Sequence, residues 1–376
     1  MALAECRLQL GTATMAQMTF ADRLAGALVM APMTKGSNLP YRRLCIELGA
    51  RVTMSEMTVA RRLKQKRKGE FALIRRAPDE PFFGVQLAGT NPEEMAWAAG
   101  LVEARGADYV DINFGCPIDH FTRKGLGASI GRTPNRIRRI VEAMKRGVTH
   151  VPVTAKIRLG WNDDDRNFID QARAAEDAGA DAITVHGRTR NARYRLAADW
   201  DAIGQVAAAV KVPVVGNGDI LFPHDVEAAR AKSGCLAVMS ARGVLIKPWL
   251  FREVAEGYQD YDGDARVVIY RRYVALALEH WGDDEHGRAR VREFLRWHVA
   301  FWCRYARRRD DGSWPSMQER EGLPVLRSPL EVLLARSDVQ ALDYVTACLM
   351  AGEALDPALA PVREDAAVVA DVMAEG

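Results

Sequence analysis

One cysteine stands where it could do chemistry on a bound molecule. Cys116 follows the apolar run 109–112, which is typical of a short buried strand, and lies between Gly115 and Pro117. Both neighbours break regular structure, so they expose the thiol at the strand's C-terminal edge. Asn113 precedes this turn, and its amide can donate and accept hydrogen bonds, which suits a polar heterocycle such as a pyrimidine. The alternative role for Cys116 is a small residue that fills a turn.

The apolar runs of the first 250 residues end in a recurring way. Each of eight runs is followed, at or just beyond its C-terminal end, by one member of a set that is polar except for its first residue: Met33, Glu56, Gln86, Asn113, Lys156, His186, Asn217 and Arg242. In a parallel barrel all strand ends point to the same face, where the active site is built. We therefore expect these side chains to line one mouth, although any one of them alone could be a turn former or a surface group.

Two features of this set indicate a flat, phosphorylated cofactor. Gln86 and Lys156 can bond the edge of a polar ring, and the lysine cation would stabilise negative charge on a reduced flavin. The turns at 216–219 and 240–243 follow the seventh and eighth runs, where barrels commonly bind a phosphate. The glycines of these turns allow close approach of the backbone, and Arg242 adds a guanidinium fork for phosphate oxygens.

Strand-like runs alternate with helical segments between residues 27 and 250 and would position these side chains. The eight runs are 28–33, 52–55, 83–87, 109–112, 153–157, 182–186, 212–216 and 236–239. Helix candidates between them include 92–105, 135–146, 165–178 and 224–231. This repetition predicts an α/β fold of the (β/α)₈ TIM-barrel type. A doubly wound open sheet is disfavoured, because no GxGxxG motif follows the first run and opens a helix.

Eight segments between residues 27 and 255 carry a resemblance to a known family. They are MAPM (30–33), VQL (85–87), DINFGCP (111–117), KGLGASI (124–130), KIRLGW (156–161), VHGRT (185–189), GNGDI (216–220) and SARGVLIKPWLF (240–251). In order and spacing they resemble the tRNA-dihydrouridine synthases. SEMTVARRL (55–63), FFGVQLAG (82–89), AADW (197–200) and residues 280–305 are most similar to the eukaryotic branch that modifies the variable loop of tRNA. The zinc-finger region that precedes the catalytic domain in that branch has no counterpart in this sequence.

The resemblance implies reduction of the C5=C6 bond of a specific uridine in tRNA to 5,6-dihydrouridine, with bound FMN as hydride donor and NADPH as its reductant. Cys116 would be the general acid that protonates C5, and Asn113 and Arg158 would hold the uracil. The residues implied at the flavin are Pro32, Met33 and Thr34 against the isoalloxazine, Gln86 and Lys156 at its ring edge, His186 beside it, and Asn217, Gly218, Asp219, Ala241 and Arg242 at the phosphate. A uracil inside folded tRNA must be extruded to reach such a site, at a cost of roughly a few kcal/mol.

The alternation of strands and helices stops after residue 250, and residues 256–350 are predicted to be helical. Eight arginines and no lysine lie between 288 and 309. A basic helix face of this kind is typical of RNA-backbone binding, and we assign Arg304, Arg307 and Arg308 to tRNA. A solvated helix face is the alternative. A second basic run, residues 61–68, follows the second strand on the active face of the barrel.

Composition bounds the remaining expectations. Hydrophobic residues make up 48% and charged residues 27%, which is ordinary for a soluble protein, and no apolar run approaches the ~18 residues of a membrane span. The six cysteines are scattered without a CxxC pair, which predicts reduced thiols in a cytoplasmic protein with no disulfide framework and no metal site. We expect a monomer with tRNA as its partner, no protein partner and no membrane attachment.

The sequence thus divides into four predicted segments. Residues 1–20 form a lead-in without a secretory signal, 21–255 an FMN-binding barrel, 256–350 a helical tRNA-binding domain, and 351–376 a loosely packed tail. Two rival functions share parts of this pattern. An FMN-dependent dehydrogenase of a small molecule, of the dihydroorotate dehydrogenase type, would have the same barrel without needing the arginine-rich region. A non-catalytic tRNA-binding protein would need that region but not the Cys116 turn.

Overall fold

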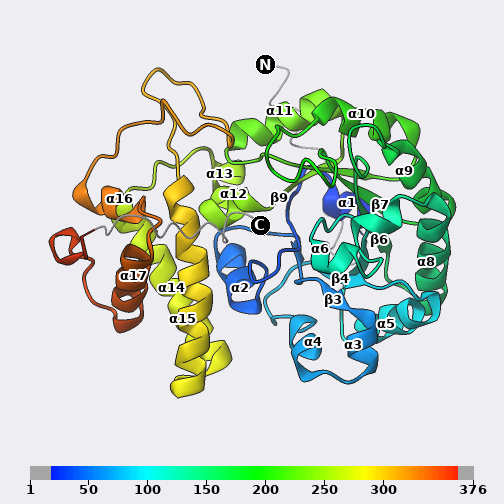
Figure 1. The fold of residues 1–376 in the computed structure, drawn as a ribbon, viewed down its shortest axis with the longest axis horizontal. Helices are drawn as coiled ribbons and strands as arrows, with labels where there is room; N and C mark the ends of the chain where they lie inside the picture. Colours follow the sequence, from blue (N-terminus) through cyan, green and yellow to red (C-terminus); the bar gives the residue numbers. More distant parts are fainter. Residues whose placement is uncertain (1–17, 363–376) are drawn as a thin grey trace.

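A closed ring of parallel strands forms the centre of the computed structural model, which describes residues 18–362 (Figure 1). The sheet order is β1-β9-β8-β7-β6-β5-β4-β2, with β3 also paired to β4, and a parallel bridge between Val29 and Val52 joins its two ends. The strands are β1 (Leu28–Met30), β2 (Thr53–Met54), β3 (Thr58–Val59), β4 (Phe83–Ala88), β5 (Tyr109–Asn113), β6 (Val153–Arg158), β7 (Ala182–His186), β8 (Val214–Asn217) and β9 (Ala237–Ser240). This confirms the predicted (β/α)₈ barrel.

The strand boundaries differ from prediction where backbone chemistry limits pairing. The run 28–33 is predicted as one strand, but β1 ends at Met30, because Pro32 has no N–H to give to a ladder. The second barrel strand is split: β2 pairs with the start of β4 and β3 with its end, at Leu87 and Ala88. The split leaves Glu56 and Met57 between β2 and β3, with Met57 at the mouth of the barrel.

The N-terminal end of the barrel is closed by packing. Helix α1 (Phe20–Leu24) places Phe20 with its ring centroid 5.6 Å from that of Tyr109 and 5.9 Å from that of Phe82. Leu24 belongs to the same buried cluster inside the strands, together with Met54 and other inward-facing residues. Strands β4, β5 and β7 are buried along their whole length, because helices cover their outer faces and side chains fill the barrel. The opposite, C-terminal end is therefore the one available for a site.

Helices surround the strands, as the alternation predicts (Figure 1). Those on the barrel are α2 (Leu39–Glu47), α3 (Ala60–Lys64), α4 (Lys68–Leu73), α5 (Pro92–Ala104), α6 (Asp119–Thr122), α7 (Ala128–Gly131), α8 (Pro134–Gly147), α9 (Phe168–Asp177), α10 (Trp200–Ala209), α11 (Pro223–Ser233), α12 (Arg242–Ile246) and α13 (Leu250–Glu256). The four predicted helices correspond to α5, α8, α9 and α11. Several begin at side-chain caps; the Asn91 side chain, for example, accepts a hydrogen bond from the backbone of Glu94 at 3.0 Å.

A second group of helices covers one side of the barrel (Figure 1, left). It comprises α14 (Gly263–Trp281), α15 (Glu285–Val299), the 3₁₀ helix η3 (Ala300–Arg304), α16 (Pro329–Leu334), α17 (Val339–Ala351) and a second 3₁₀ turn, η4 (Pro357–Leu359). Helix α14 packs on α2, where Tyr41 and Tyr273 meet edge to face at 5.7 Å between ring centroids. His298 of α15 stacks on the same Tyr41 ring at 4.0 Å. The interface is aromatic and buried, so the two groups share one core.

The basic helix face predicted over the arginines of residues 288–309 does not extend to the end of that range. Helix α15 ends at Val299, Arg304 lies in η3, and residues 305–328 have no regular helix or strand. Prolines at 315 and 324 and glycines at 312 and 322 interrupt helical hydrogen bonding there. Arg307 and Arg308 therefore do not extend a basic face of α15.

Two predicted segments fall partly outside the described residues. The lead-in is described only from residue 18, and the tail only as far as residue 362. Within that range no helix is long and apolar enough to span a membrane.

Candidate active site

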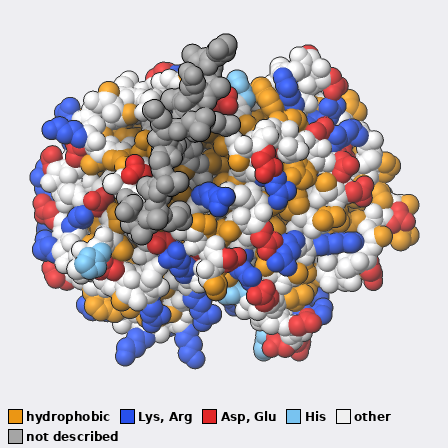
Figure 2. All heavy atoms as spheres, turned by 180° about the vertical axis from the view of Figure 1, so that it is seen from behind, with side chains coloured by type: hydrophobic (Ala, Val, Ile, Leu, Met, Phe, Trp, Pro, Cys, Tyr) orange, Lys and Arg blue, Asp and Glu red, His pale blue; other side chains and the backbone are white. Residues whose placement is uncertain are grey.

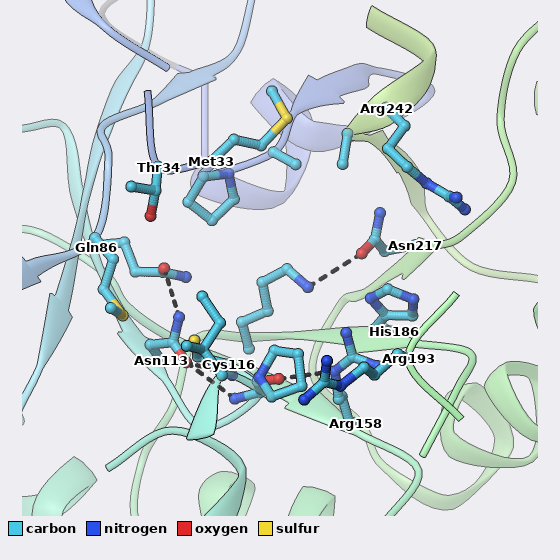
Figure 3. A pocket seen from close by; sticks show the side chains of 18 of the residues that line it. Met33, Thr34, Gln86, Asn113, Cys116, Arg158, His186, Arg193, Asn217 and Arg242 are labelled. Atoms are coloured by element: carbon cyan, nitrogen blue, oxygen red, sulfur yellow. Dashed lines mark hydrogen bonds between the residues drawn. The ribbon is translucent and has the colours of Figure 1, made fainter. Parts of the chain in front are cut away.

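A cavity of about 450 Å³ opens at the C-terminal ends of the strands (Figure 3). That volume is within the range of small-molecule and cofactor sites, roughly 300–1,000 Å³. It brings together most of the predicted site residues: Pro32, Met33, Thr34, Gln86, Asn113, Cys116, Lys156, Arg158, His186, Asn217, Ala241 and Arg242. Six others do not line it. Glu56, which was expected at the mouth, is buried and accepts the Lys35 N–H at 2.7 Å. Gly218 and Asp219 lie behind its Arg242 end, and Arg304, Arg307 and Arg308 lie in the C-terminal region.

Strand register explains why these side chains meet. Asn113 on β5 is opposite Lys156 on β6, and Arg158 on β6 is opposite His186 on β7. His186 is in turn opposite Asn217 on β8. The parallel register at the strand ends thus places side by side residues that are 28 to 43 positions apart in sequence.

A chain of hydrogen bonds between side chains runs from the barrel core to the Cys116 turn. The Gln86 Nε2 donates to Asp111 at 2.7 Å, and the Asn113 Nδ2 donates to the Gln86 Oε1 at 2.8 Å. The Asn113 Oδ1 accepts the backbone N–H groups of Gly115 and Cys116 at 3.1 and 2.8 Å. Asn113 therefore uses its oxygen within the protein and presents only its remaining N–H to a ligand, so it is a donor here and not the donor and acceptor that we predicted.

The Cys116 thiol is held on the cavity wall by the turn that follows it. Gly127, with φ of 58°, is so close that a Cβ there would lie 2.9 Å from the Cys116 Cβ. The backbone N–H of Ala128 donates to the Cys116 carbonyl at 3.1 Å. Burial raises the pKa of the Cys116 thiol, against the opposing effects of the Ile118 backbone and the Arg158 and Lys156 cations. The thiol is thus protonated at neutral pH, which fits a proton donor better than a thiolate nucleophile.

Two cations lie on the cavity floor beside this thiol. The Lys156 Nζ donates to the Asn217 Oδ1 at 3.1 Å, and the Arg158 Nε donates to the Gly115 carbonyl at 2.7 Å. Burial, together with the nearby Arg158 cation, lowers the pKa of Lys156 to about 7, and Asp111 opposes this only in part. Because the Lys156 ammonium group is poorly solvated, a ligand that places negative charge beside it would stabilise it.

The titration of Lys156 gives a first prediction. Lys156→Met should stabilise the cofactor-free protein, by up to about 5 kcal/mol, because folding desolvates the amine. The cost of the buried cation is fully present below the folded pKa of about 7 and fades as pH rises towards the ordinary value of 10.5, where the unfolded chain also loses its proton. Thermal unfolding at both ends of that window should show the gain shrinking with pH. The exposed Lys211→Met is the control, and an equal gain at both ends would contradict the assignment.

The Arg242 end of the cavity is organised around one carboxylate. Asp219, with φ of 53°, accepts from the Arg188 NH2 at 2.6 and 2.5 Å and from the Arg242 NH2 at 3.1 Å. The Gln318 Nε2 donates to it at 2.7 Å and the Ala198 N–H at 2.8 Å. A carboxylate in this position would repel a phosphate, so the geometry favours Asp219 as the group that positions the two arginines, and Arg242 as the residue that meets the anion.

The residues present fit a flavin mononucleotide. Spare donors at Asn113, Gln86 and Lys156 can meet the polar edge of a flat ring, while Pro32 and Met33 supply an apolar wall. The adjoining Gly218 has φ of 143°, where a side chain is rarely accommodated. The lining of the cavity is therefore apolar in the middle, polar along one edge and positively charged at one end.

Several lining residues were missed by the sequence analysis. Trp297 reaches the cavity from α15, and a Cβ on Gly36 would lie 3.3 Å from its ring. Tyr194 lies in the loop after β7, with the Arg242 guanidinium 4.4 Å from its ring centroid. The VHGRT segment gave a signal that this loop belongs to the site. Nothing in the sequence pattern marked Trp297, because helical periodicity places it equally well in a core.

This chain is similar in sequence to members of a known protein family. The family model described as "Dihydrouridine synthase (Dus)" matches residues 29–299. The curated relatives include two named "tRNA-dihydrouridine(47) synthase [NAD(P)(+)]-like". That from Oryza sativa subsp. japonica is 43% identical over 286 residues, covering 74% of this chain and 41% of the relative, and that from Homo sapiens is 40% identical over 285 residues, covering 75% and 44%.

A third relative, from Coprinopsis cinerea and named "tRNA-dihydrouridine(47) synthase [NAD(P)(+)]", is 36% identical over 331 residues, covering 84% of this chain and 49% of the relative. The chain spans less than half the length of each of these relatives. Among solved structures, a complex of 2-naphthoyl-CoA reductase with 2-naphthoyl-CoA superposes with a TM-score of 0.53 at 12% identity, covering 64% of this chain and 51% of that one. This likeness supports the barrel fold.

Proposed function

The chain belongs to the dihydrouridine synthase family, and we propose that it reduces the C5=C6 bond of a uridine in tRNA to 5,6-dihydrouridine, with bound FMN and with NADPH as the electron source. One observation carries the proposal. A protonated thiol, a buried lysine and a positioned arginine face a single cavity of a size suited to a flavin and a base. The relatives' printed names support tRNA as the substrate, and position 47 as the first position to examine.

The residues assigned to FMN follow the chemistry of the cavity. Arg242 would hold the phosphate, with Arg188 and Asp219 fixing its direction. Gln86 and Lys156 would bond the polar edge of the ring, and Pro32 would pack against its face. FMN, when bound, supplies a hydride to C6 of the uracil. The Lys156 cation would stabilise negative charge at that edge of the ring.

The side chains around Cys116 account for the remaining proton. The Asn113 N–H can donate to a uracil carbonyl, since its oxygen is already used by the Cys116 turn. Arg158, fixed by the carbonyls of Gly115 and Thr189, can support a second carbonyl. The Cys116 Sγ then delivers its proton to C5, and solvent returns a proton to the thiolate. One hydride and one proton together saturate the double bond.

The setting of the reaction is also part of the proposal. The base must leave the tRNA stack to reach the cavity, so the protein surface around the mouth must hold the flanking nucleotides. We place the enzyme in the cytoplasm as a monomer. The five cysteines of the described residues are free thiols, in keeping with a reducing compartment.

A competing function is an FMN-dependent dehydrogenase of a small molecule, and one experiment separates the two. Enzyme reduced anaerobically with NADPH is mixed either with unmodified tRNA or with orotate, while flavin absorbance is followed. We expect tRNA to reoxidise the flavin and orotate to leave it reduced. Reoxidation by orotate but not by tRNA would support the small-molecule dehydrogenase and overturn our proposal.

A further inference from the structure

The most unbalanced charge on the described surface lies in residues 61–68, which we call the basic stretch. It carries six cations and no carboxylate: Arg61, Arg62, Lys64, Lys66, Arg67 and Lys68. All six are exposed. Arg62 pairs with Glu70 at 3.1 Å, and the other five side chains have no hydrogen-bond or ion-pair partner among residues 18–362. Five unpaired cations within eight residues repel one another, so these charges do not stabilise the fold.

The fold holds this stretch at the rim of the cavity. Strand β3 immediately precedes it and pairs with the last residues of β4, just beyond Gln86, which lines the cavity. Met57, directly before β3, lines the cavity as well. Figure 2 shows Lys and Arg side chains gathered at the lower left, over the part of the molecule where Figure 1 places α3 and α4. The basic stretch therefore starts only four positions after Met57, a residue that lines the cavity.

The stretch is also rigidly mounted. Ala60 and Leu63 are fully buried in the main core, which fixes one face of α3. The Glu70 carboxylate of α4 accepts the Val59 N–H at 2.8 Å, so α4 is tied back to the start of α3. Lys66, with φ of 59°, forms the sharp turn between the two helices. A pre-ordered array of cations loses less entropy on binding than a mobile one.

The arginines that the sequence assigned to tRNA are in a different state. The Arg304 NH2 donates to the Met317 carbonyl at 3.3 Å, and the Arg307 NH1 pairs with Asp310 at 2.7 Å. The Arg308 Nε donates to the Gly312 carbonyl at 2.8 Å, and its guanidinium lies 4.7 Å from the Trp314 ring centroid. These side chains brace the irregular segment 305–328, so contact with a phosphate would have to compete with bonds already made.

We propose that the basic stretch binds the tRNA phosphate backbone beside the extruded uridine. This rests on the proposed function, since it names the surface by which the same site receives its RNA. Arginine and lysine side chains without partners can release condensed counterions from RNA, which is the main source of backbone affinity. The only apolar side chain of the stretch, Leu63, is buried, so it offers no group for insertion into a membrane.

The test compares three charge-matched variants of the full chain. The first is Arg61→Gln, Lys64→Gln and Arg67→Gln in the basic stretch, and the second is Arg304→Gln, Arg307→Gln and Arg308→Gln. The third, a control, is Arg139→Gln, Arg173→Gln and Lys211→Gln, three exposed positions on α8, on α9 and before β8. Binding of labelled tRNA is measured at several salt concentrations, and FMN content and Tm establish that each variant is folded.

We expect the basic-stretch variant alone to lose about tenfold or more in affinity at low salt. Its salt slope should flatten by about 0.7–0.9 for each phosphate contact removed. Affinity equal to the control would overturn the proposal, as would a loss confined to the second variant. Wild-type binding to phosphatidylserine vesicles in preference to tRNA would assign the stretch to a membrane instead and also overturn it. Failure of wild-type enzyme to reduce tRNA at all would count against the proposed function, whereas normal reduction with an unchanged salt slope would count against this surface alone.

Discussion

Replacing Cys116 by alanine should lower dihydrouridine formation by about 10²–10⁴-fold, the usual contribution of a general acid. The structure gives the reason. The thiol faces the cavity, its pKa is raised by burial, and the turn behind it allows little movement. Reduction of bound flavin by NADPH should continue in the variant, because no proton from this residue enters that half of the reaction. The measurement is single-turnover conversion of tRNA by enzyme reduced beforehand.

A second cysteine provides the control for this experiment. Cys303 is also half-buried and also has its pKa raised by burial, but it lies outside the cavity in η3. Cys303→Ala should convert tRNA at the wild-type rate. If Cys116→Ala retained that rate, or if both variants lost it equally, the proton would have to come from another group.

Replacing Arg242 by glutamine should raise the Kd for FMN by about 10–100-fold, since a charge-assisted bond to phosphate contributes roughly 1.5–3 kcal/mol. Asp219→Asn gives the sharper distinction. If the carboxylate faced the phosphate, neutralising it would remove a repulsion and tighten binding. Because Asp219 instead holds Arg188 and Arg242, we expect Asp219→Asn to weaken FMN binding, although less than Arg242→Gln does.

Both affinities can be measured by flavin fluorescence quenching in protein stripped of cofactor. Arg173→Gln, an exposed change on α9, serves as the control and should leave the Kd for FMN as it is. Tighter binding in the Asp219→Asn variant would return this residue to the phosphate-contacting role that the sequence predicts. It would also mean that the arginines are positioned by something other than the carboxylate.

The sequence predicts most of the barrel site because barrel geometry is regular. Strands that pair in parallel bring their C-terminal residues to one ring, so Gln86, Lys156 and Asn217 could be placed together from the strand ends alone. Local chemistry also identified the Cys116 turn, where glycine and proline leave little choice of structure. The exact strand limits were less predictable, because a ladder ends where a residue such as Pro32 cannot donate.

Contacts from the C-terminal region could not be predicted in this way. Trp297 and Gln318 reach the cavity and its Arg242 end through packing between segments far apart in the chain, with 99 positions between Gln318 and Asp219. No local pattern encodes such a pair. The same limit applies to Arg307. Its arginine-rich surroundings suggested a helix face, but the prolines and glycines that follow it favour a loop, and in that loop Arg307 pairs with Asp310.

We propose that this chain makes dihydrouridine in tRNA, and mass analysis of tRNA after the reaction measures this directly. Unmodified tRNA is incubated with the full chain, FMN and NADPH, digested to nucleosides and fragments, and the mass of each uridine-containing fragment is compared with that of an untreated sample. We predict that one uridine gains the mass of two hydrogens, that position 47 is its place, as in the relatives' names, and that the gain depends on Cys116. A flavin-loaded enzyme that oxidises NADPH yet leaves every uridine unchanged would contradict the claim.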